Sequence, residues 1–275
     1  MSRILSLAAL TVLELSPPDM VSCAAAAGYT HVGLRLLPAT PQEAAWPMVG
    51  DTPLVREVRA RLDDTGTSVL DIEILRLKPD TCIEDFAEVL ETGAKLGARN
   101  VLVAGNDPDE ARLTARFADL CDLAAPLGLF PGLEPMPWTD VRDFAQARRI
   151  LTTARRPNAG IIVDPLHFDR AGSVPAEIAQ APSEWLHFAQ LCDAPSERPA
   201  NTEGLLFQAR AERLMPGEGG LDLLGILEAL PPDTPLSLEI PMVELAKTVG
   251  SVERARRMRA ATLALLARLP NRHPH

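Results

Sequence analysis

The chain has 275 residues, 47% of them hydrophobic, and a formal net charge of -10 at pH 7. This acidic balance, with no cluster of Lys and Arg, excludes nucleic acid as the expected partner, because phosphate backbones are bound by concentrated positive charge. No apolar run approaches the roughly 20 residues that a membrane-spanning helix needs, so no membrane partner is expected either.

The N-terminus and the cysteines indicate where the protein works. The opening residues, MSRILSLAAL, lack the small-residue cleavage pattern of a signal peptide and lead into a helix-start signal. Cys23, Cys82, Cys121 and Cys192 form no CxxC pair, which favours reduced thiols over a disulfide framework or a zinc knuckle. Both observations predict a cytoplasmic protein.

Eight apolar segments of strand length follow one another along the chain. They are continuously apolar rather than alternating, which is typical of parallel strands that are covered on both faces. The segments are residues 4–10, 31–36, 68–74, 100–104, 128–133, 160–163, 185–190 and 235–240.

Helix signals separate these segments. The clearest helix is expected at residues 16–27, with Ser16 as N-cap, Pro17 in the first turn and Gly28 as the stop. A long amphipathic helix is expected after the last strand, with Leu263 among its inward-facing residues and its arginines mostly outside. That last helix is expected at residues 251–269, and the remaining expected helices are residues 52–64, 83–96, 108–125, 140–155 with Asp140 as cap, 175–180 and 221–230.

The number and size of the units predict the fold. Eight strand–helix units in about 270 residues give roughly 30 to 35 residues each, the size of a βα unit with its loops. An open doubly wound sheet would carry a Gly-rich first turn, whereas the turn after the first segment, TVLELSPPD, has no Gly. No Gly- or Ser-rich linker divides the chain. We therefore predict an α/β protein made of a single (β/α)8 TIM barrel, with residues 1–275 as one domain.

Four oxygen-bearing side chains stand at or just after the ends of the last four apolar segments: Glu134, Asp164, Gln190 and Glu239. The carboxyl ends of parallel barrel strands meet on one face, so these side chains are expected to converge there. Crowded carboxylates raise one another's pKa unless a cation compensates. Oxygen donors without thiolate favour Mn²⁺ or Mg²⁺, with Zn²⁺ as the third candidate. For any single residue, the alternative is a carboxylate that caps the next helix or bonds to a loop.

Further residues are candidates for substrate binding. His167, three residues after Asp164, is predicted to hydrogen-bond a substrate carbonyl oxygen, with a surface loop histidine as the alternative. Arg213 and Arg76 are candidates to hold a carboxylate or phosphate bidentately, and exposed surface arginine is the alternative for each. Glu73, on the third strand, is expected near the mouth of the pocket. Trp138, after the fifth strand, is expected to pack on a substrate ring or to cap the barrel.

Five short motifs in the second half of the chain resemble the xylose isomerase-like TIM barrel family. This family includes sugar phosphate isomerases and epimerases, inosose dehydratases and 3-dehydroshikimate dehydratases. The motifs are LEP at 133–135, VDPLH at 163–167, QLCDA at 190–194, MPGEG at 215–219 and LEIP at 238–241. Many members carry His where Gln190 stands, and many carry Glu-x-His on the fifth strand, where this chain has Met136. Gln190 therefore groups this chain with members that include both dehydroshikimate dehydratase-like proteins and isomerase-like proteins.

The resemblance implies a divalent-metal-dependent sugar or sugar phosphate isomerase or epimerase. In that reading, Glu134 and Glu239 are both metal ligands and acid/base groups on opposite sides of the substrate carbon, and an enediolate forms by proton transfer next to a carbonyl, with His167 assisting. The substrate would be a small polyhydroxylated carbonyl compound. Barrels of this kind often dimerise through helices and loops, so a homodimer is expected.

Two other functions are alternatives. The same enolate can expel a β-hydroxyl, which would make the protein a lyase like 3-dehydroshikimate dehydratase or an inosose dehydratase. A barrel that binds a small molecule without catalysis is the third function considered. The isomerase or epimerase is the favoured expectation from the sequence.

Overall fold

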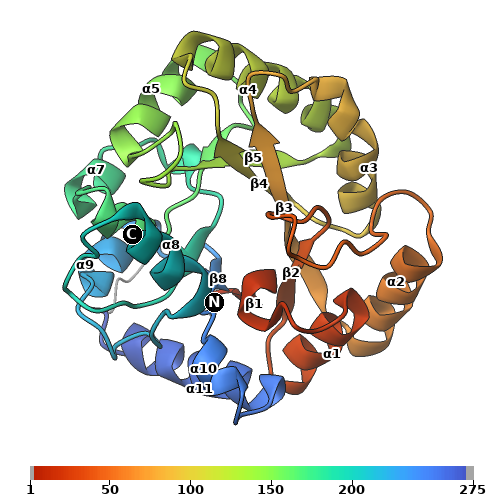
Figure 1. The fold of residues 1–275 in the computed structure, drawn as a ribbon, viewed down its shortest axis with the longest axis vertical. Helices are drawn as coiled ribbons and strands as arrows, with labels where there is room; N and C mark the ends of the chain where they lie inside the picture. The colour runs from red at the N-terminus through yellow and green to blue at the C-terminus, as the bar shows by residue number, and fades with distance from the viewer. Residues whose placement is uncertain (1–2, 271–275) are drawn as a thin grey trace.

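The computed structural model describes residues 3–270, and eight parallel strands form an inner ring surrounded by helices (Figure 1). This confirms the predicted TIM barrel. The strands are β1 Leu5–Leu7, β2 His31–Arg35, β3 Ser68–Leu77, β4 Asn100–Gly105, β5 Phe130–Glu134, β6 Gly160–Ile161, β7 Ala189–Leu191 and β8 Leu236–Leu238.

The sheet closes on itself between β6 and β7. Its hydrogen-bonded order is β6-β5-β4-β3-β2-β1-β8-β7, so those two strands are its edges. A parallel bridge pairs Val163 with Ala189, and the backbone N–H of Gln190 donates to the carbonyl oxygen of Val163 at 2.9 Å. Because the paired strands are all parallel, their carboxyl ends lie on one face of the ring.

The helices lie mostly outside the ring. The α-helices are α1 Pro17–Ala26, α2 Pro53–Thr65, α3 Ala87–Lys95, α4 Glu110–Ala124, α5 Phe144–Ala154, α6 Pro165–Arg170, α7 Pro175–Ala179, α8 Thr202–Ala211, α9 Leu223–Ala229, α10 Val243–Ala246 and α11 Ser251–Leu266. Short 3-10 turns are η1 Ala9–Val12, η2 Ile83–Phe86, η3 Ala125–Leu127 and η4 Ser183–Trp185. The sequence did not predict α6 and α8, which matter here because both carry residues of the candidate site.

Three strand boundaries differ by at least three residues from the prediction. The third strand continues to Leu77 instead of ending at residue 74. The other two strands are shorter than predicted. The first strand ends at Leu7, because the following residues turn into η1, where the Thr11 hydroxyl donates to the carbonyl of Leu238 and accepts from the N–H of Ile240. The seventh strand begins only at Ala189, because the segment around Trp185 forms η4. Neither change moves the strand-end residues to another face.

Helix details also differ from expectation. Asp143 rather than Asp140 caps α5, and its carboxylate accepts from the N–H of Gln146 at 2.7 Å. Leu263 of α11 is 43% exposed rather than inward-facing. The inward face of this helix instead includes Arg254, which is 2% exposed, donates to the carbonyl of Val249 and pairs with Glu14. One arginine predicted to lie outside is therefore buried.

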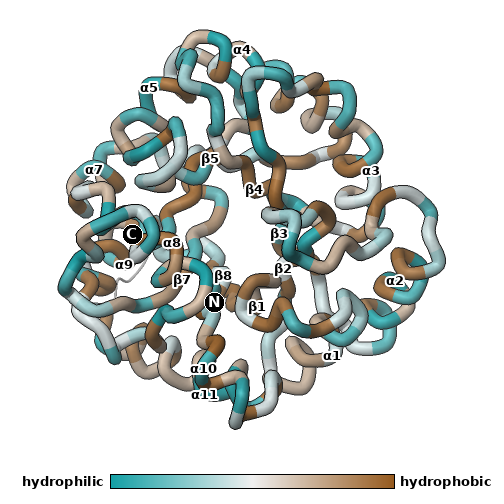
Figure 2. Tube along the Cα trace, viewed as in Figure 1, coloured by the Kyte–Doolittle hydropathy of each residue, from teal (hydrophilic) through white to brown (hydrophobic). Residues whose placement is uncertain are grey.

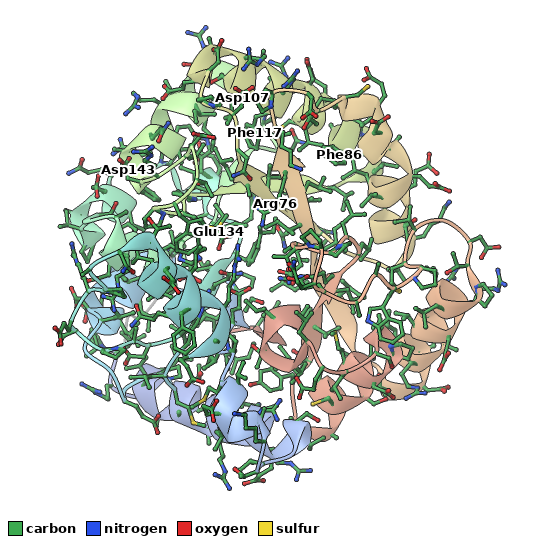
Figure 3. All side chains as sticks on the ribbon, viewed as in Figure 1. Arg76, Phe86, Asp107, Phe117, Glu134 and Asp143 are labelled. Atoms are coloured by element: carbon green, nitrogen blue, oxygen red, sulfur yellow. The ribbon has the colours of Figure 1, made fainter. Side chains whose placement is uncertain are left out.

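The core fills the space between the ring of strands and the helices. Hydrophobic residues concentrate along the strands and the inner sides of the helices (Figure 2). No helix in residues 3–270 is long and apolar enough to cross a membrane. Phe117 of α4 belongs to this core and is fully buried (Figure 3).

Truncating Phe117 tests the packing. We expect Phe117→Ala to lower the free energy of unfolding by about 3 to 5 kcal/mol, because it removes a buried ring and leaves a cavity. Phe207→Ala is the matched control, since Phe207 is 61% exposed, and its effect should stay within about 0.5 kcal/mol. Urea unfolding followed by circular dichroism measures both, and equal losses in the two variants would contradict this assignment of the core.

Candidate active site

The structure brings the four strand-end residues together. Glu134 is the last residue of β5, Gln190 lies in β7, and Glu239 directly follows β8. Asp164 follows β6 and is the N-cap of α6. All four are at most 4% exposed. They share the carboxyl face of the barrel, as the sequence predicted from their positions.

Asp164 has the helix-capping role that the sequence gave as the alternative to a metal ligand. Its Oδ1 accepts hydrogen bonds from the backbone N–H groups of Leu166 at 2.8 Å and His167 at 3.1 Å, so it caps α6, whose first residue is Pro165. Its Oδ2 points to the other side and accepts from Arg213. The cap fixes the carboxylate while leaving the second oxygen for the site.

Arg213 is the centre of the charge network. Its Nη1 lies 2.5 Å from Asp164 Oδ2 and its Nη2 lies 2.6 Å from Glu239 Oε2. Its Nε donates to the carbonyl oxygen of Ala209 at 2.9 Å, and its side chain is 1% exposed. The sequence assigned this arginine to a substrate anion, whereas the structure pairs its charge with two carboxylates of the protein. The substrate-binding role of Arg213 stays a prediction.

Glu239 has both carboxylate oxygens engaged. The amide nitrogen of Gln190 donates to Oε1 at 3.0 Å, while Arg213 donates to Oε2. In contrast, Glu134 Oε1 and Gln190 Oε1 are buried and have no hydrogen-bond partner within residues 3–270. Buried acceptors without a donor are costly unless a cation or a ligand satisfies them. This donor set fits a divalent ion.

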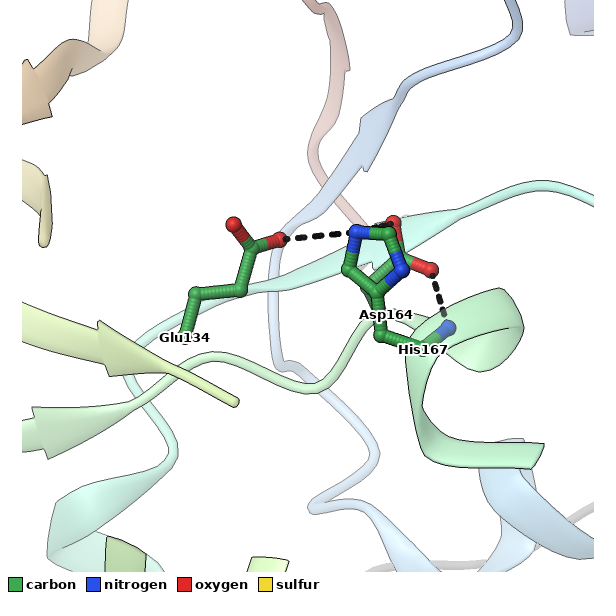
Figure 4. A group of neighbouring side chains, drawn as sticks. All are labelled: Glu134, Asp164 and His167. Carbon is green, nitrogen blue, oxygen red and sulfur yellow. Dashed lines mark hydrogen bonds and ion pairs between the residues drawn. The ribbon is translucent and has the colours of Figure 1, made fainter. Parts of the chain in front are cut away.

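His167 lies between two carboxylates (Figure 4). Its Nε2 is 3.9 Å from Glu134 Oε1 and 4.0 Å from Asp164 Oδ2, and these three residues offer ligand atoms within 4.8 Å of one another. Trp138 packs edge-on against the imidazole with the ring centroids 4.9 Å apart. His167 could therefore be an ion ligand as well as the substrate ligand that the sequence predicted.

Burial sets the electrostatics of the site. It raises the pKa of Glu134 well above the usual value, and the nearby Glu239 and Asp164 raise it further. The pKa of Glu239 rises to about 7, chiefly through burial and against the effect of Arg213. Burial would also raise the pKa of Asp164, but Arg213 and His167 hold it below the usual value. Burial lowers the pKa of His167 to about 4, so its imidazole is neutral at neutral pH.

The remaining predicted residues line a cavity of about 330 Å³ above these groups. Glu73 is 3% exposed, and its Oε1 lies 3.0 Å from Arg35 Nη2. Arg35 also pairs with Glu43 at 2.9 Å. Arg76 and Trp138 contribute to the same wall.

Two cavity arginines were not predicted as site residues. Arg35 is the last residue of β2, so the strand-end rule that identified Glu134 would also have found it. Arg210 lies in the last turn of α8, a helix that the sequence analysis did not predict. Asn201, whose side chain accepts from the N–H of Gly204 as the N-cap of α8, is the sequence signal for that helix.

A family model decides the classification. The model described as "Xylose isomerase-like TIM barrel" matches residues 21–263. The chain belongs to the xylose isomerase-like TIM barrel family. The match confirms the resemblance inferred from the motifs of the second half and extends it over most of the first half.

Curated members of this family differ in their reactions. A 3-dehydroshikimate dehydratase from Pseudomonas aeruginosa is 30% identical over 201 residues, which are 67% of this chain and 31% of that protein. An inosose isomerase from Bacillus subtilis is 28% identical over 158 residues, which are 54% of this chain and 55% of that protein. The chain thus spans about a third to half of the length of these relatives.

Solved structures of the family share the fold. The IOLI protein, crystallised with a binding zinc atom, has a TM-score of 0.78 and 22% identity, and the match covers 98% of this chain and all of that one. A fusion of a xylose isomerase-like TIM barrel with 4-hydroxyphenylpyruvate dioxygenase has a TM-score of 0.79 and 23% identity over 96% of this chain and 43% of that one. At these identities the likeness shows the fold alone.

Replacing Arg213 tests the charge balance of the site. We expect Arg213→Met to destabilise the metal-free protein by about 3 to 5 kcal/mol, because Asp164 and Glu239 lose their shared cation. Added Mn²⁺ should raise the melting temperature of this variant more than that of the wild type. A bound ion stabilises the native state by mass action, and in the variant it would also replace the positive charge lost beside Asp164 and Glu239.

Arg254→Met is the control for this experiment, because Arg254 is a second buried arginine that pairs with Glu14. Thermal unfolding in chelator and in Mn²⁺ provides both readouts. A metal-free Arg213→Met protein as stable as the wild type, or an equal Mn²⁺ response in both variants, would contradict the charge balance described here.

Proposed function

We propose that the protein is a divalent-metal-dependent lyase that removes a proton next to a carbonyl and expels a β-hydroxyl as water. The observation that carries this proposal is the asymmetry between the two glutamates. Glu134 has a free, buried oxygen, whereas both oxygens of Glu239 accept hydrogen bonds from Gln190 and Arg213. One available carboxylate suits an elimination, in which a single group can accept and return the proton.

Four residues would hold the ion: Glu134, Asp164, Gln190 and Glu239, and the neutral imidazole of His167 would lie beside it. Support comes from the unpartnered oxygens of Glu134 and Gln190 and from the spacing of Glu134, Asp164 and His167. Oxygen and imidazole donors without thiolate favour Mn²⁺ or Mg²⁺ and also suit Zn²⁺. A bound ion supplies a Lewis acid that polarises the carbonyl oxygen of the substrate.

The protein groups would divide the proton transfer as follows. Glu134 takes the proton from the carbon next to the carbonyl, and the electron pair of that C–H bond becomes the new double bond. The C–O bond to the β-hydroxyl breaks, and Glu134 returns the proton to the departing oxygen, which leaves as water. His167 donates a hydrogen bond to the carbonyl oxygen as negative charge develops there. Trp138 packs against His167 and fixes the orientation of its ring.

An isomerase or epimerase is the second candidate. Glu239 lies on the same rim as Glu134, and such enzymes need acid/base groups on both sides of the substrate carbon. The similarity to an inosose isomerase supports this reading. For both reactions the proposed substrate is a small polyhydroxylated carbonyl compound. The homodimer and the cytoplasmic location stay predictions.

Metal analysis tests the first requirement of the proposal. Protein purified without chelator should contain about one divalent ion per chain, because the site offers one cluster of oxygen and imidazole ligands. Removing the ion with chelator should abolish turnover, and Mn²⁺ should restore it. A protein that takes up no ion from added Mn²⁺, Mg²⁺ or Zn²⁺ would instead be a non-catalytic binding barrel.

Turnover assays separate the two reactions. With Mn²⁺-loaded protein, dehydroshikimate should give the growing absorbance of a conjugated acid. Glu134→Gln should lower kcat by about 10²- to 10⁴-fold, the usual contribution of a general acid/base. Glu228→Gln, on the exposed face of α9, is the control. Solvent deuterium appearing in a recovered ketose, with no conjugated acid, would establish the isomerase instead.

A further inference from the structure

Four arginines line the cavity above the site, and they fall into two pairs. Arg35 and Arg213 are neutralised, because each lies within 3.0 Å of two carboxylates of the protein. Arg76 and Arg210 line the same cavity. Within residues 3–270, neither of them forms an ion pair with a carboxylate.

Arg76 is held in place by a neutral partner. It lies near the carboxyl end of β3, and Figure 3 shows its side chain near the middle of the ring, close to Glu134. Its Nη1 donates to Asn106 Oδ1 at 3.0 Å, which orients the guanidinium without neutralising it. Burial lowers the pKa of Arg76 and the charge of Arg210 lowers it further, while the charge of Glu134 acts in the opposite direction.

Arg210 comes from α8, which Figure 1 shows across the ring from β3. It lies in the last turn of α8, one residue after Ala209, whose carbonyl oxygen accepts from Arg213. Arg213 follows two residues after the end of α8 and points to the buried carboxylates, whereas Arg210, on the helix itself, lines the cavity. Two like charges in one partly buried cavity repel each other unless an anion lies between them.

We propose that Arg76 and Arg210 bind an anionic oxygen group of the substrate, a carboxylate or a phosphate, while the carbonyl lies at Glu134 and His167. Guanidinium forks match the oxygens of both anions. The cavity has an apolar wall formed by Ile74, Met136 and Trp138. The carbon skeleton of the substrate would lie against this wall, between the anionic group and the reacting carbonyl. This inference rests on the proposed function only for the position of the carbonyl.

The inference narrows the substrate class. Among polyhydroxylated carbonyl compounds, those with an acid or phosphate group should bind, and neutral sugars and inososes should bind poorly. The neutralised pair, Arg35 and Arg213, cannot supply this preference because its charge is already shared with four carboxylates.

Matched ligands test the proposal by calorimetry on Mn²⁺-loaded protein. Shikimate is compared with its neutral methyl ester, and myo-inositol 1-phosphate with myo-inositol. At least one anion should bind on the order of 10- to 100-fold more tightly than its neutral counterpart, the size expected for charge-assisted hydrogen bonds. The pair with the larger ratio identifies carboxylate or phosphate as the natural group.

Variants of the two arginines test whether they cause the preference for anionic ligands. Arg76→Gln and Arg210→Gln should each remove most of the preference for the anion while leaving the affinity for the neutral ligand unchanged, which also shows that the variants are folded. Arg59→Gln, on the exposed surface of α2, is the matched control and should change neither. Equal affinity for anions and neutral ligands, or a preference that survives both substitutions, would overturn the proposal.

The binding experiment tests the anion site separately from the proposed reaction, which the turnover assays test. A protein that converts a neutral ketose and ignores the anions would refute the anion site and leave proton abstraction standing. A protein that binds the anions through Arg76 and Arg210 but forms no product from any substrate would support the anion site and refute the proposed reaction.

Discussion

The guanidinium of Arg213, held between Asp164 and Glu239, is the interaction on which the site depends. Two carboxylates of the barrel rim are buried at this point, and burying them without a cation would cost several kcal/mol. Arg213 offsets this cost for one oxygen of each carboxylate. The buried oxygens Glu134 Oε1 and Gln190 Oε1 have no hydrogen-bond partner within residues 3–270, and they are the atoms that the proposed ion would bind.

The barrel supplies this arrangement through ordinary backbone rules. Parallel strands place Glu134, Gln190 and Glu239 at one rim, and the N-cap of α6 fixes Asp164 beside them. Other residues that line the cavity come from loops and short helices rather than from strands. One of them is Arg210, which lies in α8. Such loops vary chemistry while the strands stay the same, which is consistent with dehydratases and isomerases among the relatives.

The sequence predicted the barrel and the four rim residues because strands covered on both faces are continuously apolar and end at polar residues. It could not predict the role of Arg213, because a long side chain from a distant segment can reach many positions and only the fold shows which carboxylates it meets. The boundaries of the first and seventh strands were wrong because 3-10 turns follow or precede them with equally apolar residues. Helix α6 was missed although Asp164 and Pro165 are typical of a helix start.

The closure between β6 and β7 has a mechanical consequence. Strand β6 has two residues, and an isolated bridge joins it to β7, so this seam has less backbone hydrogen bonding to resist local opening than the long ladders of β3 and β4. Asp164 follows one strand of the seam and Gln190 belongs to the other. An ion bound by both residues would link the two edge strands. Amide protons along β6 and β7 would then exchange with solvent more slowly when the ion is bound.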